Sequence, residues 1–372
     1  MYEIVLESRR LEEVVEICLE ASVVALDTEF ARTSTYYPIV GLIQIFDGKN
    51  CYLIDPLSVK DMSSLTKLLC DSSVVKVLHA CSEDMEVFQY ALGVTPTPAY
   101  DSQIAAAIMG VGFSLSYQKL VEHYLSLQIS KEETRSDWLK RPLNAAQLEY
   151  AALDVIHLYD VYQKQLVELE RLNRSEWVTA DCVLLPKNIP TLVEPEAYYL
   201  KVKNISKLSR SQLNLLKYLC AWRERKARIL NVPRNRVVEE KSLFTMVLQN
   251  VFYDEKRQLD GLLSRGQIHR FGEEIIDVCN QASQAQGSEQ PVSMSHSKTP
   301  LSSQSLRDLK EVVEKCAKDL NISQELLAKR RQLEQLLRSV DKDGIYHLPE
   351  SLKGWRQEVI GRLLLNFLGQ KT

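Results

Sequence analysis

An acidic pair closes the first long apolar run of the chain and constrains both the fold and the chemistry. Residues 23–26 are all apolar and predict a buried strand, and Asp27-Thr28-Glu29-Phe30 follows directly. Because alternate side chains of a strand share a face, Asp27 and Glu29 point the same way. A hard divalent cation, which prefers oxygen ligands, would relieve the repulsion between them. The alternative is a strand that ends in an ordinary polar loop, with Asp27 as a helix cap.

The first 200 residues alternate strand-like and helix-like patterns. Strands are predicted at 2–6, 23–29, 40–46, 51–54 and 74–78, and helices at 11–19, 63–70, 83–92 and 144–172. Asp47-Gly48-Lys49-Asn50 separates the third and fourth strands and is a hairpin turn signal. Early strands with a hairpin, followed by helices, predict an α/β domain with a mixed sheet flanked by helices.

The second half of the chain reads as helical. A connector containing Pro186, Pro190 and Pro195 leads to residues 206–282, where Ser209 stands at a helix-cap position. A Ser/Gln-rich stretch without apolar periodicity predicts a flexible linker. We therefore predict two all-α helical bundles after the α/β domain, the second of which could be a divergent copy of the first. The predicted boundaries are 1–200 for the α/β domain, 206–282 for the first bundle, 283–304 for the linker and 305–372 for the second bundle.

Composition narrows the class of protein. A length of 372 residues allows two or three domains of about 100–200 residues each. No stretch approaches the ~20 apolar residues of a membrane span, and the N-terminal residues do not have the pattern of a signal peptide. The eight cysteines include no Cys-x-x-Cys pair, which argues against a zinc site or a disulfide framework. We expect a cytoplasmic protein that contacts no membrane.

The net charge of −3 conceals a basic segment. Residues 201–241 hold 12 Lys/Arg against three Glu, so the rest of the chain is acidic. A basic segment on an acidic body indicates contact with a polyanion, although a solvated helix face is an equal alternative. Four cations of this segment lie on or near one predicted helix and two follow in a loop: Arg223, Arg225, Lys226 and Arg228, then Arg234 and Arg236.

Three further acids are candidate partners of the first pair. Asp84 and Asp101 each follow a strand or turn and begin a helix, so either could be only a helix cap. Asp154 stands among apolar residues inside the long helix, where an unpaired carboxylate is costly. Tyr150 precedes it by four residues and so shares its helix face, which also allows a simple structural hydrogen bond.

Taken together, these motifs resemble the tyrosine-bearing branch of the DEDD superfamily of 3′→5′ exonucleases, and most closely the ribonuclease D family. The nuclease motifs are Asp27-x-Glu29, His79-Ala80-Cys81-Ser82-Glu83-Asp84 and Tyr150-x-x-x-Asp154, supported by Ser136-Asp137-Trp138 and Arg141-Pro142-Leu143. The first helical block resembles an HRDC domain, through Ala221-Trp222-Arg223-Glu224 and Pro233-Arg234-Asn235. The second resembles the more divergent HRDC-type domain of that family. The resemblance implies a ribonuclease H-like fold for the α/β domain.

The resemblance also implies a mechanism. Asp27, Glu29, Asp84 and Asp154 would hold two divalent ions, Mg²⁺ or Mn²⁺, and the protein would need no organic cofactor. Tyr150, whose phenol has an ordinary pKa of about 10, would orient the attacking water rather than act as its base. The substrate would be RNA with a free 3′ end, such as precursor tRNA, and the product a nucleoside 5′-monophosphate. The residues expected to bind this substrate are Thr28, Phe30, Trp138, Arg141, Arg223 and Arg228.

Several alternatives stay open at this point. Trp138 could pack in the core and Arg141 could form a structural ion pair. His157, which follows Asp154 on the same helix, is interpreted as an ordinary helix residue. A DNA 3′→5′ exonuclease and an inactive nucleic-acid-binding scaffold are the competing functions, and intact acids at all four positions argue against the scaffold. We expect a monomer. Which acid bridges the two ions is left undecided.

Overall fold

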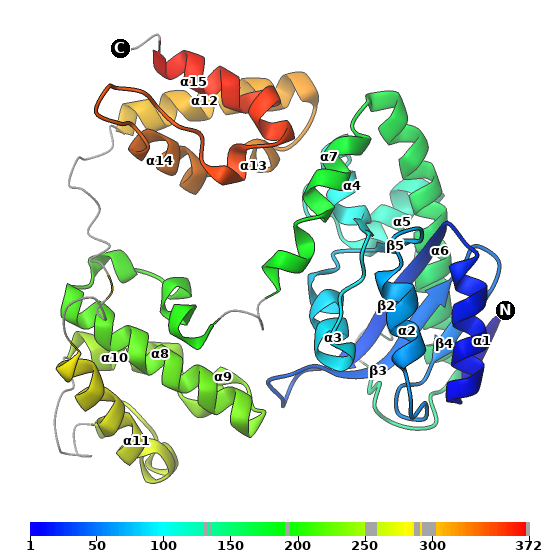
Figure 1. The fold of residues 1–372 in the computed structure, drawn as a ribbon, viewed down its shortest axis with the longest axis horizontal. Coiled ribbons are helices and arrows are strands. Elements are labelled where there is room, and N and C mark those ends of the chain that lie inside the picture. Colours follow the sequence, from blue (N-terminus) through cyan, green and yellow to red (C-terminus); the bar gives the residue numbers. More distant parts are fainter. Residues whose placement is uncertain are drawn as a thin grey trace. The chain divides into compact units, whose positions relative to one another are not determined.

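The computed structural model describes residues 1–129, 133, 136–189, 194–249, 259–285, 291 and 303–369. The chain divides into two compact units (Figure 1). The first unit holds Met1–Ala31, Val40–Ile189 and Pro300–Thr372, and the second holds Arg32–Ile39 and Pro190–Thr299. The predicted α/β domain and the C-terminal bundle therefore belong to one unit, and the first helical bundle forms the core of the other.

A six-stranded mixed sheet lies at the centre of the first unit, in the order β1-β4-β3-β2-β5-β6. Strands β3 and β4 are antiparallel across the turn at Asp47, as predicted, whereas β1/β4, β2/β5 and β5/β6 are parallel. Ala25 of β2 pairs with Val77 of β5, so both parallel strands end at the same edge of the sheet. The strands are β1 (Tyr2–Val5), β2 (Val23–Ala31), β3 (Ile39–Phe46), β4 (Cys51–Ile54), β5 (Val75–Leu78) and β6 (Ala99–Asp101).

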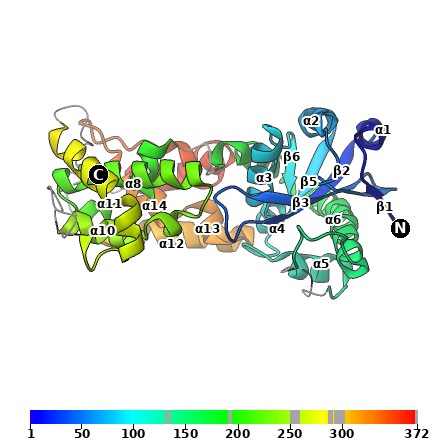
Figure 2. The same cartoon turned by 90° about the horizontal axis from the view of Figure 1, so that it is seen from below.

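Helices cover both faces of the sheet (Figure 2). One face packs against α1 (Ser8–Leu19), α2 (Ser63–Cys70) and α3 (Ser82–Leu92), and the other against α4 (Ser102–Met109) and α6 (Ala145–Leu172). Helices α5 (Tyr117–Leu125) and α7 (Ser175–Cys182) complete this part. Alternation along β2 follows these layers, since Val24 and Leu26 join the α1–α3 core and Val23 and Ala25 join the α6 core.

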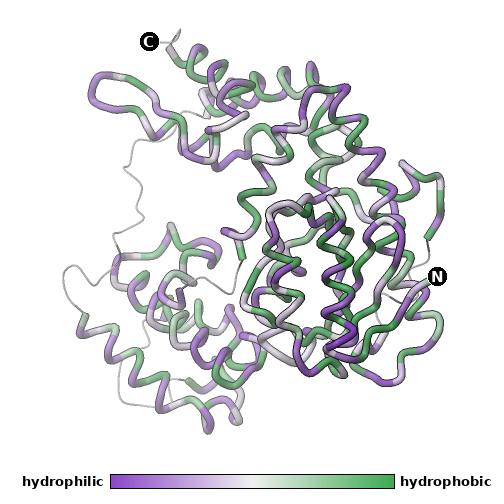
Figure 3. The backbone as a smooth tube through the Cα atoms, turned by 45° about the vertical axis from the view of Figure 1, so that its right-hand side comes forward, coloured by the Kyte–Doolittle hydropathy of each residue, from purple (hydrophilic) through white to green (hydrophobic). Residues whose placement is uncertain are grey.

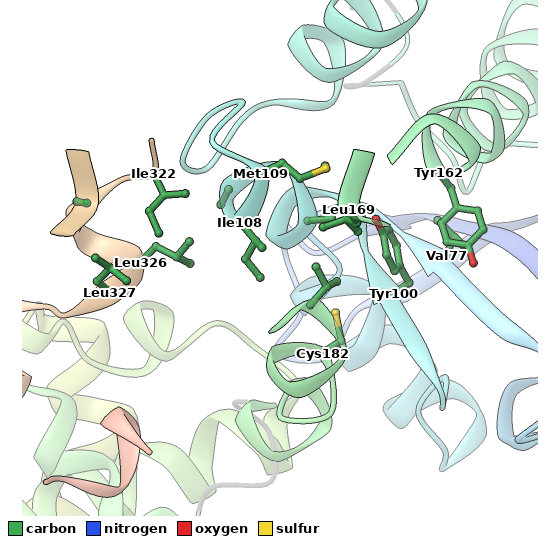
Figure 4. Packing of buried hydrophobic residues seen from close by; sticks show 14 of the residues in the cluster. Val77, Tyr100, Ile108, Met109, Tyr162, Leu169, Cys182, Ile322, Leu326 and Leu327 are labelled. Atoms are coloured by element: carbon green, nitrogen blue, oxygen red, sulfur yellow. The ribbon is translucent and has the colours of Figure 1, made fainter. Parts of the chain in front are cut away.

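The C-terminal bundle packs on α4 and α7 of the same unit. Arg174 donates to the carbonyls of Ile108 and Leu320 and so joins the two parts, while the rings of Trp177 and Trp355 stack at 4.4 Å. In Figure 4, Ile108 and Met109 of α4 lie beside Ile322 and Leu326 of the bundle. The bundle consists of α12 (Ser303–Leu320), α13 (Gln324–Leu327), α14 (Arg330–Arg338), the 3₁₀ turn Glu350–Leu352, the π-helical turn Gln357–Gly361 and α15 (Arg362–Gly369).

The second unit is an all-helical bundle built around α8. Ser209 caps α8 in a reciprocal capping box with Gln212, as the sequence predicts for this position. Hydrophobic and hydrophilic stretches alternate along the helices (Figure 3), which is the pattern of amphipathic helices around a core. The elements are the 3₁₀ helices Pro195–Lys201 and Ile205–Lys207, α8 (Arg210–Leu230), α9 (Arg234–Val237), α10 (Glu240–Leu248) and α11 (Arg265–Gln284).

A segment from between β2 and β3 completes the second unit. The hydroxyl of Tyr36 donates to Glu224, which is only 1% exposed, and accepts from Arg228 and Arg234. The amides of Tyr36 and Tyr37 both donate to the side chain of Asn231, which follows α8. These contacts neutralise a buried carboxylate with two arginines.

The predicted α/β class with a mixed sheet and two helical bundles is confirmed. Strand β6 and helices α5 and α7 were not predicted. The linker predicted at 283–304 lies mostly outside the described residues, although α11 continues to Gln284. No helix in the part of the chain that the structure describes has the length and apolar character needed to cross a membrane.

Candidate active site

Three of the predicted acids meet between strand β2 and helix α6. Asp27 and Glu29 continue the odd-numbered positions of β2, the face that packs against α6. Asp154 approaches from the middle of α6, where it is 7% exposed. One carboxylate oxygen from each of the three lies within 4.8 Å of the other two. Residues separated by more than 120 positions thus form one carboxylate cluster.

Asp84, the fourth acid, lies in the first turn of α3 beside the same strand. Its Oδ1 accepts a hydrogen bond of 2.5 Å from the hydroxyl of Thr28, the residue between Asp27 and Glu29. Asp84 is 8% exposed, and its carboxylate is close enough to raise the pKa of both Asp27 and Glu29. The acids of the first two motifs are therefore adjacent, and the structure brings all four together.

The environment of these acids favours their protonated forms. Burial, followed by the charges of the other acids, raises the pKa of Asp27 well above its usual range and that of Glu29 to about 9. Burial also raises the pKa of Asp84 to about 6 and that of Asp154 to about 7, although hydrogen bonds from Thr28 and Tyr150 oppose these shifts. Four ionised carboxylates need compensating positive charge here. Among the described residues, no lysine, arginine or histidine forms a salt bridge with any of them.

The donor set fits a divalent cation. Carboxylate oxygens are the ligands that Mg²⁺ and Mn²⁺ prefer, and three of them converge within the reach of one ion. The remaining acid, Asp84, is adjacent to this group and could contribute to a second ion. Burial and mutual repulsion raise the pKa values of these acids, no cationic side chain among the described residues pairs with them, and a bound cation would supply that charge.

Tyr150 lies one helical turn before Asp154, and its hydroxyl is close enough to that carboxylate to lower the pKa of Asp154. Burial and the neighbouring acids raise the pKa of Tyr150 far above that of a free phenol, so its hydroxyl stays protonated at neutral pH. Tyr117 of α5 donates to the backbone carbonyl of Asp154 and holds the same turn of α6 from the other side. Tyr117 was not among the predicted site residues, because no sequence spacing relates it to the acids.

A cavity of about 400 Å³ opens beside Tyr150 and Asp154. This volume is within the range of about 300–1,000 Å³ that small-ligand sites occupy. Its wall includes His157, whose Nδ1 is buried and has no hydrogen-bond partner in the described part of the chain. His157 was predicted to be an ordinary helix residue, although its position one turn after Asp154 places it on the same helix face. The described lining residues are Leu127, Gln128, Ile129, Glu133, Ala146, Glu149, Tyr150, Leu153, Asp154 and His157.

Most of the predicted substrate-binding residues of the first unit make contacts within the protein. Thr28 is buried and bonded to Asp84, and Phe30 is partly exposed on β2. Trp138 is 3% exposed in the core that includes α6, with its ring 6.2 Å from that of Tyr150. Arg141 pairs with both oxygens of Asp55 and also donates to backbone carbonyls, including that of Gly41. These contacts favour the structural alternatives, which are core packing for Trp138 and an ion pair for Arg141.

The two predicted arginines of the second unit also make internal contacts. Arg223 is 5% exposed, donates to the carbonyl of Val238 and lies 3.9 Å from Glu240. Arg228 binds Glu224 and the hydroxyl of Tyr36. Neither guanidinium is directed freely toward solvent, because each compensates a carboxylate or a carbonyl inside the bundle.

Comparison with known proteins supplies the family. Three family models match the chain. The model described as "3'-5' exonuclease" matches residues 2–170, "HRDC domain" matches 212–279, and "Ribonuclease D, C-terminal HRDC domain" matches 300–364. Ribonuclease D of Pseudomonas paraeruginosa is 40% identical over 346 residues, covering 92% of this chain and 91% of the relative. Ribonuclease D of Escherichia coli is 37% identical and covers 99% of this chain and 98% of the relative.

The chain belongs to the ribonuclease D family.

The structures agree with this assignment. The crystal structure of Escherichia coli RNase D superposes with a TM-score of 0.90 at 35% identity, over 100% of this chain and 99% of that one. The catalytic core of RRP6 from Trypanosoma brucei, at 22% identity and a TM-score of 0.58, shares the fold. Membership of the ribonuclease D family makes this chain a 3′→5′ exoribonuclease, with RNA as its substrate and a divalent-metal site of the DEDD type.

Proposed function

We propose that this member of the ribonuclease D family hydrolyses the 3′-terminal phosphodiester of RNA with two divalent ions, Mg²⁺ or Mn²⁺, and releases nucleoside 5′-monophosphates. The observation that carries the proposal is the convergence of four carboxylates around Asp27. Two of them, Asp84 and Asp154, are buried, and Tyr150 lies beside the second. Bound divalent ions would neutralise these carboxylates and supply the positive charge that stabilises attacking and leaving oxygens.

Asp27 is the best candidate for the acid shared by both ions. The pKa of Asp27 is raised by Asp84, Asp154 and Glu29, which indicates that its carboxyl group is near all three. Glu29 and Asp154 belong to the three-carboxylate group with Asp27, whereas Asp84 is held from the other side by Thr28. In this assignment Asp27, Glu29 and Asp154 would bind one ion, and Asp27 with Asp84 would bind the other.

Tyr150 orients the attacking water in the proposed mechanism. A general base must already be deprotonated near neutral pH so that it can accept the proton of the water, and the raised pKa of Tyr150 keeps its hydroxyl protonated. Its protonated hydroxyl can instead hold the water by a hydrogen bond next to Asp154. The water oxygen forms a bond to phosphorus, and the bond from phosphorus to the 3′ oxygen of the preceding nucleotide breaks. The net reaction moves one proton from the water to that oxygen, which leaves as a 3′-hydroxyl.

The cavity beside Tyr150 is the proposed place of the terminal nucleotide. Leu127, Ile129 and Leu153 offer apolar contacts to a base, and the ring of His157 forms part of the same wall. This proposal adds His157 to the substrate contacts predicted from the sequence. Thr28 and Trp138 would act beside it indirectly, by fixing Asp84 and packing near Tyr150.

The helical domains are proposed to hold the body of the RNA. Exposed cations of the basic segment, including Lys203, Lys207, Arg236 and Lys241, could contact phosphates. The Escherichia coli relative is described as an exoribonuclease involved in structured RNA processing. By analogy, precursor tRNA with a single-stranded 3′ tail is the proposed substrate, and a cytoplasmic monomer is the proposed form of this enzyme.

An assay that compares RNA with DNA and reads the direction of degradation tests the activity. RNA and DNA of equal sequence, labelled at the 5′ end and carrying 3′ overhangs, are incubated with the protein in Mg²⁺ and in EDTA. We expect a 3′-to-5′ ladder on RNA that EDTA abolishes. Equal or faster degradation of DNA would favour the DNA exonuclease, and binding without degradation would favour the scaffold.

A variant pair tests the site. Asp27→Ala should abolish turnover and leave RNA affinity largely unchanged, because the carboxylate acts on the scissile bond and not on the RNA body. Glu170→Ala, an exposed acid on α6, is the matched control and should retain full activity. Surviving activity in Asp27→Ala would show that Asp27 is not an essential ligand.

A further inference from the structure

Asp101 is a buried carboxylate near the active site that the mechanism does not use. It ends strand β6, where it pairs with Leu78 of β5, and it is 3% exposed. The chain after Leu78 turns at Ala80 and Cys81 and enters helix α3, which carries Asp84 in its first turn. Asp101 therefore lies beside the turn that leads into one of the proposed metal ligands.

The two carboxylate oxygens of Asp101 accept four backbone amides. Oδ1 accepts from Gln103 at 2.8 Å and from Ile104 at 3.4 Å, which is an ordinary N-cap of α4. Oδ1 also accepts from Ala80 at 3.0 Å, and Oδ2 accepts from Cys81 at 3.0 Å. The last two bonds reach a different segment, so capping of α4 does not account for them.

The turn that Asp101 holds is strained. Ala80 has φ of 51°, in the left-handed region, where the Cβ of an L-residue comes too close to the following carbonyl oxygen. Such a conformation persists only when its surroundings impose it. The amides of Ala80 and Cys81 both bind Asp101, and the carbonyl of Cys81 then accepts from Met85 to begin α3. The start of α3, and with it the backbone of Asp84, depends on this arrangement.

We propose that Asp101 is a positioning residue of the metal site, which fixes the Ala80–Cys81 turn and thereby places the carboxylate of Asp84 for its ion. The proposal rests on the proposed metal-dependent function. Asp84 is then held twice, through its backbone by Asp101 and through its carboxylate by Thr28. Residues that orient metal ligands without touching the ion typically contribute about 10–100-fold in metal affinity.

Asp101→Asn separates the proposed role from helix capping. Asparagine caps helices as well as aspartate does, so the bonds to Gln103 and Ile104 can remain. Its NH₂ group, however, cannot accept the amide of Cys81 while its oxygen serves the other three. The matched control is Asp47→Asn, because Asp47 also holds turn amides, those of Lys49 and Asn50, but in the β3–β4 turn.

The readout is Mn²⁺ binding to the full chain without substrate. It is measured as the loss of the electron paramagnetic resonance signal of free Mn²⁺. The relevant ion is the one whose binding Asp84→Ala abolishes. We expect Asp101→Asn to raise its half-saturation concentration about 10–100-fold and Asp47→Asn to leave it unchanged. Excess Mn²⁺ should restore nuclease activity to Asp101→Asn but not to Asp84→Ala. Unchanged Mn²⁺ affinity in Asp101→Asn, whatever its thermal stability, would overturn the proposal.

Failure of the proposed function gives a different result, since the wild-type protein itself would then bind no Mn²⁺ at these acids. If Asp101→Asn does not fold, the comparison is repeated in the Ala80→Gly background. Glycine relieves the strain at φ of 51° and retains both amide donors, so the effect of Asp101→Asn on Mn²⁺ affinity stays measurable. An equal Mn²⁺ affinity with and without Asp101→Asn in that background would equally overturn the proposal.

Discussion

Thr28 and Asp84 are 56 residues apart in sequence, and a hydrogen bond of 2.5 Å joins the hydroxyl of the first to Oδ1 of the second. This bond connects strand β2, which carries Asp27 and Glu29, to helix α3. It fixes one oxygen of Asp84 and lowers the pKa of that carboxyl group, against the larger effect of burial. Thr28 therefore acts on the metal site through Asp84.

Thr28→Val should weaken metal-dependent catalysis with little change in packing, because valine has nearly the same shape but no donor. A hydrogen bond to a charged group contributes about 1.5–3 kcal/mol, so we expect the rate at limiting Mn²⁺ to fall about 10–100-fold. Thr28→Ser retains the hydroxyl and should remain close to wild type. Thr66→Val, which removes an exposed hydroxyl from α2, is the control. A fully active Thr28→Val would contradict this role.

The raised pKa values predict that the melting temperature falls as the pH rises, and that bound Mn²⁺ opposes this fall. A carboxyl group whose pKa is raised by folding stabilises the fold below its unfolded pKa, and this contribution is lost as the pH rises through the folded pKa. For Asp84, Asp154 and Glu29 the folded values are about 6, 7 and 9. In EDTA the melting temperature should therefore fall from pH 5 to pH 9, and Mn²⁺ should raise it most at the alkaline end. Equal effects of Mn²⁺ at pH 5 and pH 8 in differential scanning fluorimetry would contradict the prediction.

Tyr150→Phe should reduce kcat about 100-fold while Mn²⁺ binding stays within a few-fold of wild type. The change removes the hydroxyl that orients water but leaves the four carboxylates in place. Tyr159→Phe, on the same helix with its ring edge-on to Phe46, provides the control and should keep its activity. The role assigned to Tyr150 fails if single-turnover rates of Tyr150→Phe match those of the wild type.

Arg141→Lys tests whether this residue is structural or contacts RNA. Lysine cannot reproduce the two-oxygen pairing with Asp55, so we expect the free energy of unfolding in urea to fall by about 1–3 kcal/mol. RNA affinity at a temperature where the variant is folded should be unchanged. The exposed neighbour Lys140→Met serves as a control for local charge. Weaker RNA binding with unchanged stability would instead support the phosphate contact predicted from the sequence.

Residue types and short-range spacing made the acids candidates, and the resemblance to the DEDD exonucleases then selected Asp27, Glu29, Asp84 and Asp154 from among them. Asp27 and Glu29 had to share a face because a strand alternates, and Tyr150 had to stand one turn from Asp154 because a helix repeats every 3.6 residues. The β3–β4 hairpin followed from a local turn signal, and its antiparallel pairing is observed. These features depend on neighbours in the chain, which periodicity and turn chemistry describe well.

The surroundings of those residues were decided by tertiary structure. Trp138, Arg141 and Arg223 look like nucleic-acid contacts by residue type, yet each lies among buried partners that sequence spacing cannot reveal. Strand β6, with three residues, was missed because so short a run has no detectable periodicity.

By itself, then, the sequence determined which acids could bind metal, through motifs that resemble those of a known family, and which local element carries each one, through backbone periodicity. Only the tertiary structure decided that Thr28 and Asp101 hold Asp84, and that a cavity with His157 lies beside Tyr150. Those relations join strands and helices that are distant in sequence. Their geometry depends on sheet order and helix packing, which no local pattern encodes.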